Sequence, residues 1–122
     1  CTFGTLKEKR INEAIEYWDS LNHKVGFIEM NPDSKTCMND QIHGFIIIKN
    51  AQLEWPTIGK THRSGSRVGV IDSALILLTI GEANLPKLLE HELGHAFGYG
   101  HLDVDGHIMH SNYDYSGWDF WD

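Results

Sequence analysis

Apolar residues recur at three- and four-residue intervals in two stretches of the chain. Residues 6–21 place such side chains on one stripe of a helix: Ile11, Ala14, Ile15, Trp18 and Leu21. Residues 85–97 repeat the pattern: Leu85, Leu89, Leu93, Ala96 and Phe97. We expect Asn84 to cap the second helix and Pro86 to lie in its first turn. The sequence thus predicts two amphipathic helices that share one core.

Short runs between these helices predict β-strands at residues 25–29, 44–49, 67–72 and 74–80. The run 44–49 is apolar and β-branched, which is typical of a strand buried on both faces. The run 67–72 is more polar, and we expect it at the sheet edge. Residues 50–66 are polar and contain Pro56, Gly59 and Gly65, which predicts a surface loop.

Length and charge exclude several classes of protein. A chain of 122 residues forms one domain, residues 1–122, and we expect a monomer. Its 10 Lys and Arg residues against 17 Asp and Glu residues give a net charge of −7, without the basic surface that nucleic acid binding requires. The longest apolar runs are shorter than the roughly 20 residues of a transmembrane helix.

The two cysteines, Cys1 and Cys37, leave two alternatives open. They form one disulfide bridge, as in proteins of oxidising compartments, or they are two free thiols. The sequence does not fix the location. If the start at Cys1 is natural, it suits a processed, exported protein, and an extracytoplasmic or secreted location is then favoured.

The predicted second helix carries candidate metal ligands. His91 and His95 are four residues apart, so both imidazoles can reach one ion from the same helix face. Hydrolytic zinc sites use three protein ligands and one open position. Gly98 can end the helix and turn the chain so that His101 becomes the third ligand. Imidazole ligands favour zinc, although copper, nickel and cobalt also bind such sites.

The pattern His91-Glu92-x-x-His95-x-x-Gly98-x-x-His101 resembles that of the metzincin zinc endopeptidases. Ile108-Met109-His110 is similar to the tight Met-turn of that family, at a spacing like that of its matrixin-like branch. The resemblance implies an α+β metzincin-like (zincin) catalytic domain. Its twisted, mostly parallel sheet, with an antiparallel edge strand, would pack on two helices, the active-site helix at about 85–97.

The resemblance and the zinc chemistry together predict peptide-bond hydrolysis with one catalytic Zn²⁺, with Glu92 as general base and acid. Met109 is expected as an apolar floor under the site. Tyr113, Tyr115 and His110 are candidates for contacts to substrate or oxyanion, although packing is the default for the tyrosines. His107 and His110 lie near enough in sequence to compete as metal ligands or to assist the intermediate, but exposed positions in a loop are the default expectation for both.

A peptide or protein substrate is expected to lie extended along the edge strand 67–72. Two alternatives to the endopeptidase stay open at this point. One is a zinc-binding module of the same shape without turnover, and the other is a zinc amidase acting on cell-wall peptides. The intact Glu92 favours an enzyme, because a module that only binds needs no general base.

Overall fold

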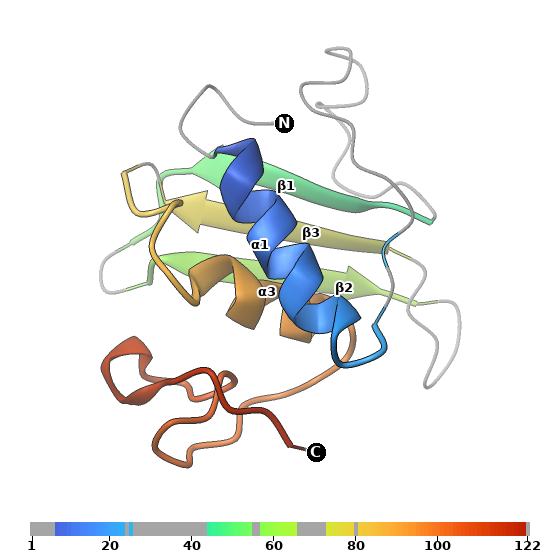
Figure 1. Cartoon of the computed structure of the whole chain (residues 1–122). Coiled ribbons are helices and arrows are strands. Elements are labelled where there is room, and N and C mark those ends of the chain that lie inside the picture. Colours follow the sequence, from blue (N-terminus) through green and yellow to red (C-terminus); the bar gives the residue numbers. More distant parts are fainter. Residues whose placement is uncertain are drawn as a thin grey trace.

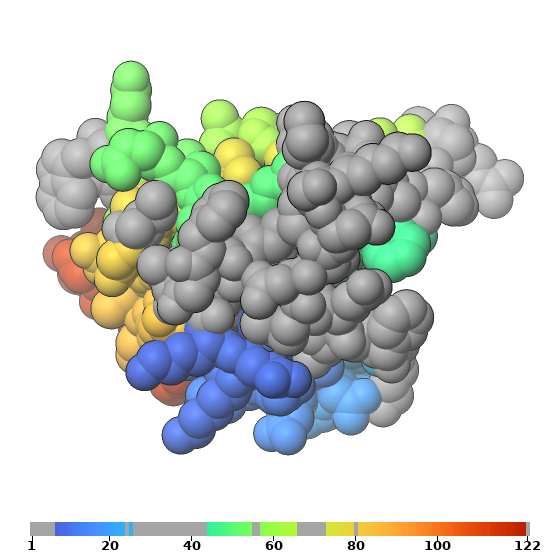
Figure 2. Space-filling model, turned by 90° about the horizontal axis from the view of Figure 1, so that it is seen from above, coloured from blue at the N-terminus to red at the C-terminus, as the bar shows by residue number. Residues whose placement is uncertain are grey.

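The computed structural model describes residues 7–23, 25, 44–54, 57–65, 73–79 and 81–121. In this part of the chain, helices α1 (Glu8–Asp19) and α3 (Leu88–Ala96) lie in front of a mixed three-stranded sheet (Figure 1). Seen from above, α1 in blue lies on one side and the strands in green lie on the other (Figure 2). This small α+β arrangement agrees with the predicted class.

The sheet has the strand order β1-β3-β2. Strand β1 (Ile46–Ala51) runs parallel to β3 (Ser73–Thr79), and β2 (Gly59–Ser64) runs antiparallel to β3. The strands predicted at 44–49 and 74–80 are confirmed, with slightly shifted bounds. A mixed sheet with one antiparallel strand was also expected.

The surface loop predicted for residues 50–66 is wrong, because β2 lies within it. Lys60 and His62 are exposed on one face of this strand, so that face carries no apolar signal. On the other face, Gly59 and Thr61 are only partly exposed, and Thr61 hydrogen bonds to Glu92 of α3. A strand that packs through polar contacts lacks the hydrophobic alternation by which strands are recognised.

Helix α1 is confirmed at the predicted position, and its apolar stripe packs into the core. Ile11, Ala14 and Trp18 are buried, and they share one hydrophobic cluster with β3 and α3. The Trp18 Nε1 donates a hydrogen bond to the backbone oxygen of Glu90 at 2.7 Å. One buried indole thus joins α1 to α3 through both packing and a hydrogen bond.

The start of α3 differs from the prediction. The helix begins at Leu88 rather than Leu85, and its N-cap is Lys87, with φ 73°. Asn84 does not cap this helix, because its Oδ1 accepts the backbone N–H of Lys7 at the start of α1, at 2.9 Å. Pro86 therefore lies in the preceding turn, outside the helix. The Asn84 side chain therefore binds a backbone N–H at the start of α1 instead of at the start of α3.

Some predicted features fall outside the described residues. These are the edge strand 67–72, residues 26–29 of the first predicted strand, and both cysteines, Cys1 and Cys37. Among the helices that the structure describes, none is both long and apolar enough to cross a membrane.

Candidate metal centre

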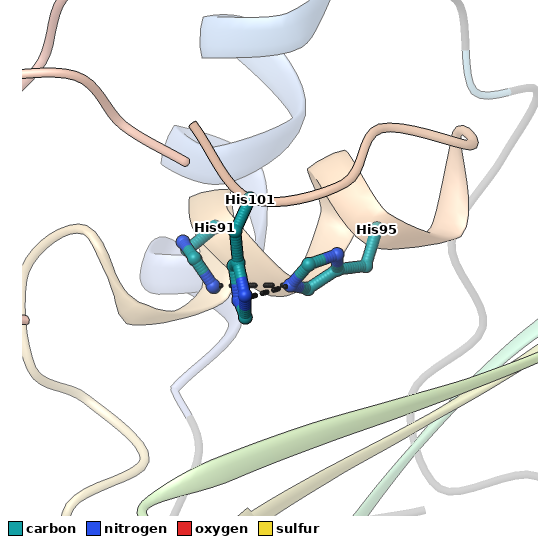
Figure 3. Close-up of side chains that lie close together, drawn as sticks. All are labelled: His91, His95 and His101. Atoms are coloured by element: carbon teal, nitrogen blue, oxygen red, sulfur yellow. Dashed lines mark hydrogen bonds between the residues drawn. The ribbon is translucent and has the colours of Figure 1, made fainter. Parts of the chain in front are cut away.

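Three histidines converge beside α3 (Figure 3). His91 and His95 lie one turn apart on the helix, and His101 comes from the segment that follows it. The Nε2 atom of His95 is 3.1 Å from Nε2 of His91 and 3.1 Å from Nε2 of His101. Ligand atoms of the three side chains all lie within 4.8 Å of one another, so the cluster could hold a metal ion.

Backbone carbonyls set the hydrogen position in two of these imidazoles. Nδ1 of His91 is 2.8 Å from the carbonyl oxygen of Ile108, and Nδ1 of His95 is 2.8 Å from that of Tyr99. Because a carbonyl only accepts, each neutral ring carries its hydrogen on Nδ1 and directs the lone pair of Nε2 into the cluster. Lone pairs that face each other at 3.1 Å repel unless a cation lies between them.

Burial disfavours protonation of these imidazoles, so a shared proton is not the favoured cation. Burial lowers the pKa of His91 to about 4, although the Ile108 carbonyl acts in the opposite direction, and it also lowers the pKa of His95. Two nitrogen ligands of a tetrahedral zinc ion lie about 3.3 Å apart when each zinc–nitrogen bond is about 2.0–2.1 Å long. Two of the three nitrogen pairs are close to this spacing, and all three ligand atoms lie within 4.8 Å of one another, so the cluster could hold a metal ion of this kind.

The turn after α3 brings His101 back to the helix, as the sequence predicts. Gly98 has φ 109°, a conformation that side chains with a Cβ rarely adopt. Its N–H donates to the carbonyl of His95 at 3.0 Å, and the next N–H, of Tyr99, donates to the carbonyl of Gly94 at 3.0 Å. This pair of bonds is a Schellman motif, which ends the helix and reverses the chain.

Met109 lies under α3, where the floor of the site was expected. The side chain is 1% exposed, and its sulfur fills the space beside Gly94, where a Cβ would clash with it. The Met109 carbonyl accepts the N–H of Leu102 at 3.0 Å, which ties the segment after His101 to the same turn. The turn around Met109 thus supports two ligands, because the neighbouring Ile108 carbonyl holds His91.

Glu92 follows His91 on α3, and its side chain lies against β2. The residue is 4% exposed, and the Thr61 hydroxyl donates to its Oε1 at 2.6 Å. Burial raises the pKa of Glu92 to about 7, and the hydrogen bond from Thr61 works in the opposite direction. Thr61 is a site residue that sequence reasoning missed. Only recognition of β2, whose alternate residues face α3, could have indicated it.

The expectation that His107 is exposed is wrong. It is 1% exposed, its Nδ1 accepts the N–H of Met109 at 2.9 Å, and its Nε2 lies 2.9 Å from the carbonyl oxygen of Trp121. It therefore joins the turn to the C-terminal segment and takes no part in the histidine cluster. His110 is partly buried, and its Nδ1 accepts the N–H of Asn112 at 2.9 Å.

Tyr113 and Tyr115 are the first and last residues of the short helix η1 (Tyr113–Tyr115). The Tyr113 hydroxyl donates to the carbonyl of Pro86 at 2.5 Å, which ties η1 to the turn before α3. Tyr115 is 58% exposed, and its ring centroid lies 5.9 Å from that of His110. A role for either tyrosine or for His110 toward substrate stays a prediction.

Comparison with known proteins gives no match to a family model, to a curated protein or to a solved structure.

Proposed function

We propose that this chain is a zinc-dependent endopeptidase of the metzincin type that acts on peptide or protein substrates. The observation that carries the proposal is the convergence of the His91, His95 and His101 Nε2 atoms next to a buried Glu92. The spacing of these residues and the buried Met109 beneath α3 support a metzincin-like site.

In the proposed site, His91, His95 and His101 hold the ion. Zinc with three imidazole ligands and an open position lowers the pKa of a water molecule and polarises a carbonyl oxygen. Glu92 accepts a proton from the attacking water and returns it to the leaving amine. Without the ion, burial raises the pKa of Glu92 to about 7. A bound divalent cation would lower this pKa and so favour the ionised carboxylate that accepts the proton.

The substrate is proposed to lie extended along the sheet. An extended peptide can add a strand to an open sheet edge through backbone hydrogen bonds. In the described part of the chain, β2 pairs with β3 on one side only, and its inward face contacts the helix that carries His91 and His95. This strand therefore replaces residues 67–72 as the substrate-aligning edge in our proposal.

The test is digestion of a complex peptide mixture by the zinc-loaded protein, read by mass spectrometry. The Glu92→Gln variant, which keeps the shape of the side chain, serves as comparison at matched zinc occupancy. We expect kcat/KM to fall by about 10²- to 10⁴-fold, the usual contribution of a general base.

Two results would count against the proposal. If the zinc-loaded wild-type protein cleaves no peptide of the mixture, the result favours the binding module or the cell-wall amidase over the endopeptidase. If Glu92→Gln cleaves as fast as wild type, Glu92 is not the base. The Lys9→Ala variant, at an exposed position on α1, controls for unspecific effects of substitution.

A further inference from the structure

Strand β2 presents alternate residues to α3. Gly59, Thr61 and Arg63 all face the helix, since successive side chains of a strand point to opposite sides. Arg63 Nη1 donates to the carbonyl oxygen of His95, near the end of α3, at 2.7 Å. Thr61 and Gly59 both contact Glu92. The inward face of β2 is thus built around the helix segment that carries the metal-ligand candidates.

The two oxygens of the Glu92 carboxylate have different surroundings. Oε1 accepts the Thr61 hydroxyl at 2.6 Å, whereas the Glu92 backbone oxygen is farther from that hydroxyl, at 3.2 Å. A hydroxyl has one hydrogen, and a bond to a charged acceptor is the stronger one. Among the described residues, Thr61 is the donor to Oε1, and no donor reaches Oε2.

The Glu92 Oε2 atom packs closely against Gly59, which has no side chain to displace it. A Cβ at this position would lie 2.9 Å from Oε2 and 3.0 Å from Cδ1 of Leu88. Contacts under 3.0 Å force a shift, so any larger residue would push the carboxylate away from β2. One oxygen is therefore held by a hydrogen bond, and the other packs against Gly59.

We infer that Thr61 is a positioning residue for Glu92: its hydroxyl holds Oε1 and so fixes the orientation of the carboxylate that exchanges the proton with substrate water and leaving amine. This inference rests on the proposed function of Glu92 as general base. Glu92 is only 4% exposed. Few water molecules can therefore replace the Thr61 hydroxyl as donor to the carboxylate in a variant that lacks this hydroxyl. The orientation of the carboxylate then depends on one hydrogen bond.

The kinetic test compares Thr61→Val, which removes the hydroxyl at nearly constant shape, with Thr61→Ser, which keeps it. In the zinc-loaded protein we expect Thr61→Val to lower kcat by roughly 10- to 100-fold, the range for loss of one hydrogen bond to a charged group. KM and zinc affinity should stay at wild-type values, and Thr61→Ser should restore kcat. Thr79→Val is the matched control, since the Thr79 hydroxyl bonds to the carbonyl of Thr57.

A second readout needs no turnover. In protein labelled with ¹³C at glutamate carboxyl groups, Glu92→Gln identifies the Glu92 resonance. We expect Thr61→Val to move or broaden this resonance, and Thr61→Ser and Thr79→Val to leave it in place.

The outcomes separate the two proposals. An unchanged resonance and unchanged kcat in Thr61→Val would overturn the positioning role, and so would a Thr61→Ser variant as impaired as Thr61→Val. A wild-type protein without turnover would instead overturn the proposed function, while the resonance still decides whether Thr61 orients the carboxylate.

Discussion

Helix α3 and the segment 98–121 contribute to the same histidine cluster in different ways. Helix α3 supplies His91 and His95 at a spacing that its backbone hydrogen bonds repeat at every turn. The segment 98–121 supplies His101 and the carbonyl that holds His91, yet its regular structure within the described residues is limited to η1 and one bridge, between His107 and Asp119.

Three consecutive residues of the irregular segment are nevertheless as deeply buried as the core residues of the helix. His107, Ile108 and Met109 are each at most 1% exposed. Their backbone groups are satisfied individually: the Ile108 N–H donates to the carbonyl of Asp119 at 2.7 Å, and the Met109 N–H donates to the His107 ring. The comparison indicates that this segment is held by individual contacts, from both backbone and side-chain groups, whereas α3 is held by repeating backbone hydrogen bonds.

A substitution in the helical part should therefore change stability and spare metal binding. The Arg10 guanidinium of α1 donates to both carboxylate oxygens of Glu90 on α3, at 2.6 and 3.3 Å, and the Glu90 side chain is 2% exposed. Arg10→Ala leaves a buried charge unpaired, so we expect the free energy of unfolding to fall by about 3–5 kcal/mol. Urea denaturation measures this loss.

The control is Lys9→Ala, at an exposed position of α1, which should change stability by less than about 0.5 kcal/mol. Zinc affinity, measured by competition with a chromogenic chelator under conditions where each variant is folded, should equal the wild-type value for both. A large loss of zinc affinity in Arg10→Ala would show that the helical part does not hold its ligands independently of this ion pair.

The same contrast explains how much the sequence could predict. Helices α1 and α3, and strands β1 and β3, carry apolar patterns that report burial directly, and they were found. Strand β2 was missed because its inward face uses a hydroxyl and a guanidinium, on Thr61 and Arg63, to bond to α3. Polar contacts between distant residues leave no periodic signal in the chain.

In the candidate site, too, local sequence patterns predicted some features, and contacts between distant residues were missed. The convergence of His91, His95 and His101 follows from helix geometry and from the turn at Gly98, so a local motif was enough. The burial of His107 depends on the return of Trp121 to the turn, 14 residues later in the chain. No local pattern encodes that contact, and a histidine in a polar loop is typical of a surface position.

Removal of the His107 ring tests the irregular part. His107→Ala leaves the buried N–H of Met109 without its acceptor, which costs about 1–3 kcal/mol of stability. The Ile108 carbonyl that holds His91 lies in the same turn, and loss of such a supporting contact typically lowers metal affinity by about 10- to 100-fold. Urea denaturation and chelator competition measure the two effects.

His62→Ala replaces an exposed histidine on β2 and should change neither the free energy of unfolding nor the zinc affinity. If His107→Ala lowers stability and leaves zinc affinity intact, the turn does not support His91, and the difference between the two regions is one of stability alone.

The smallest effect is expected where α1 contacts the C-terminal segment. The Tyr17 hydroxyl of α1 donates to the carbonyl of Trp118 in the C-terminal segment at 2.6 Å. Tyr17→Phe removes only this hydrogen bond, so we expect the free energy of unfolding at pH 7 to fall by about 0.5–1.5 kcal/mol. Thermal or urea denaturation of the two proteins side by side measures the difference, and zinc affinity should not change.

The pH dependence of this difference provides the sharper test. Burial, together with the charges of Asp119 and Glu90, raises the pKa of Tyr17 to about 12, whereas a tyrosine in the unfolded chain ionises near pH 10. Below pH 10 both states are protonated, and between pH 10 and 12 only the unfolded state loses the proton, so wild type is destabilised as the pH rises. The Phe variant lacks this group, and the stability gap should close over that range. A gap that stays constant from pH 9 to 12 would mean that the Tyr17 hydroxyl is solvated and does not link α1 to the C-terminal segment.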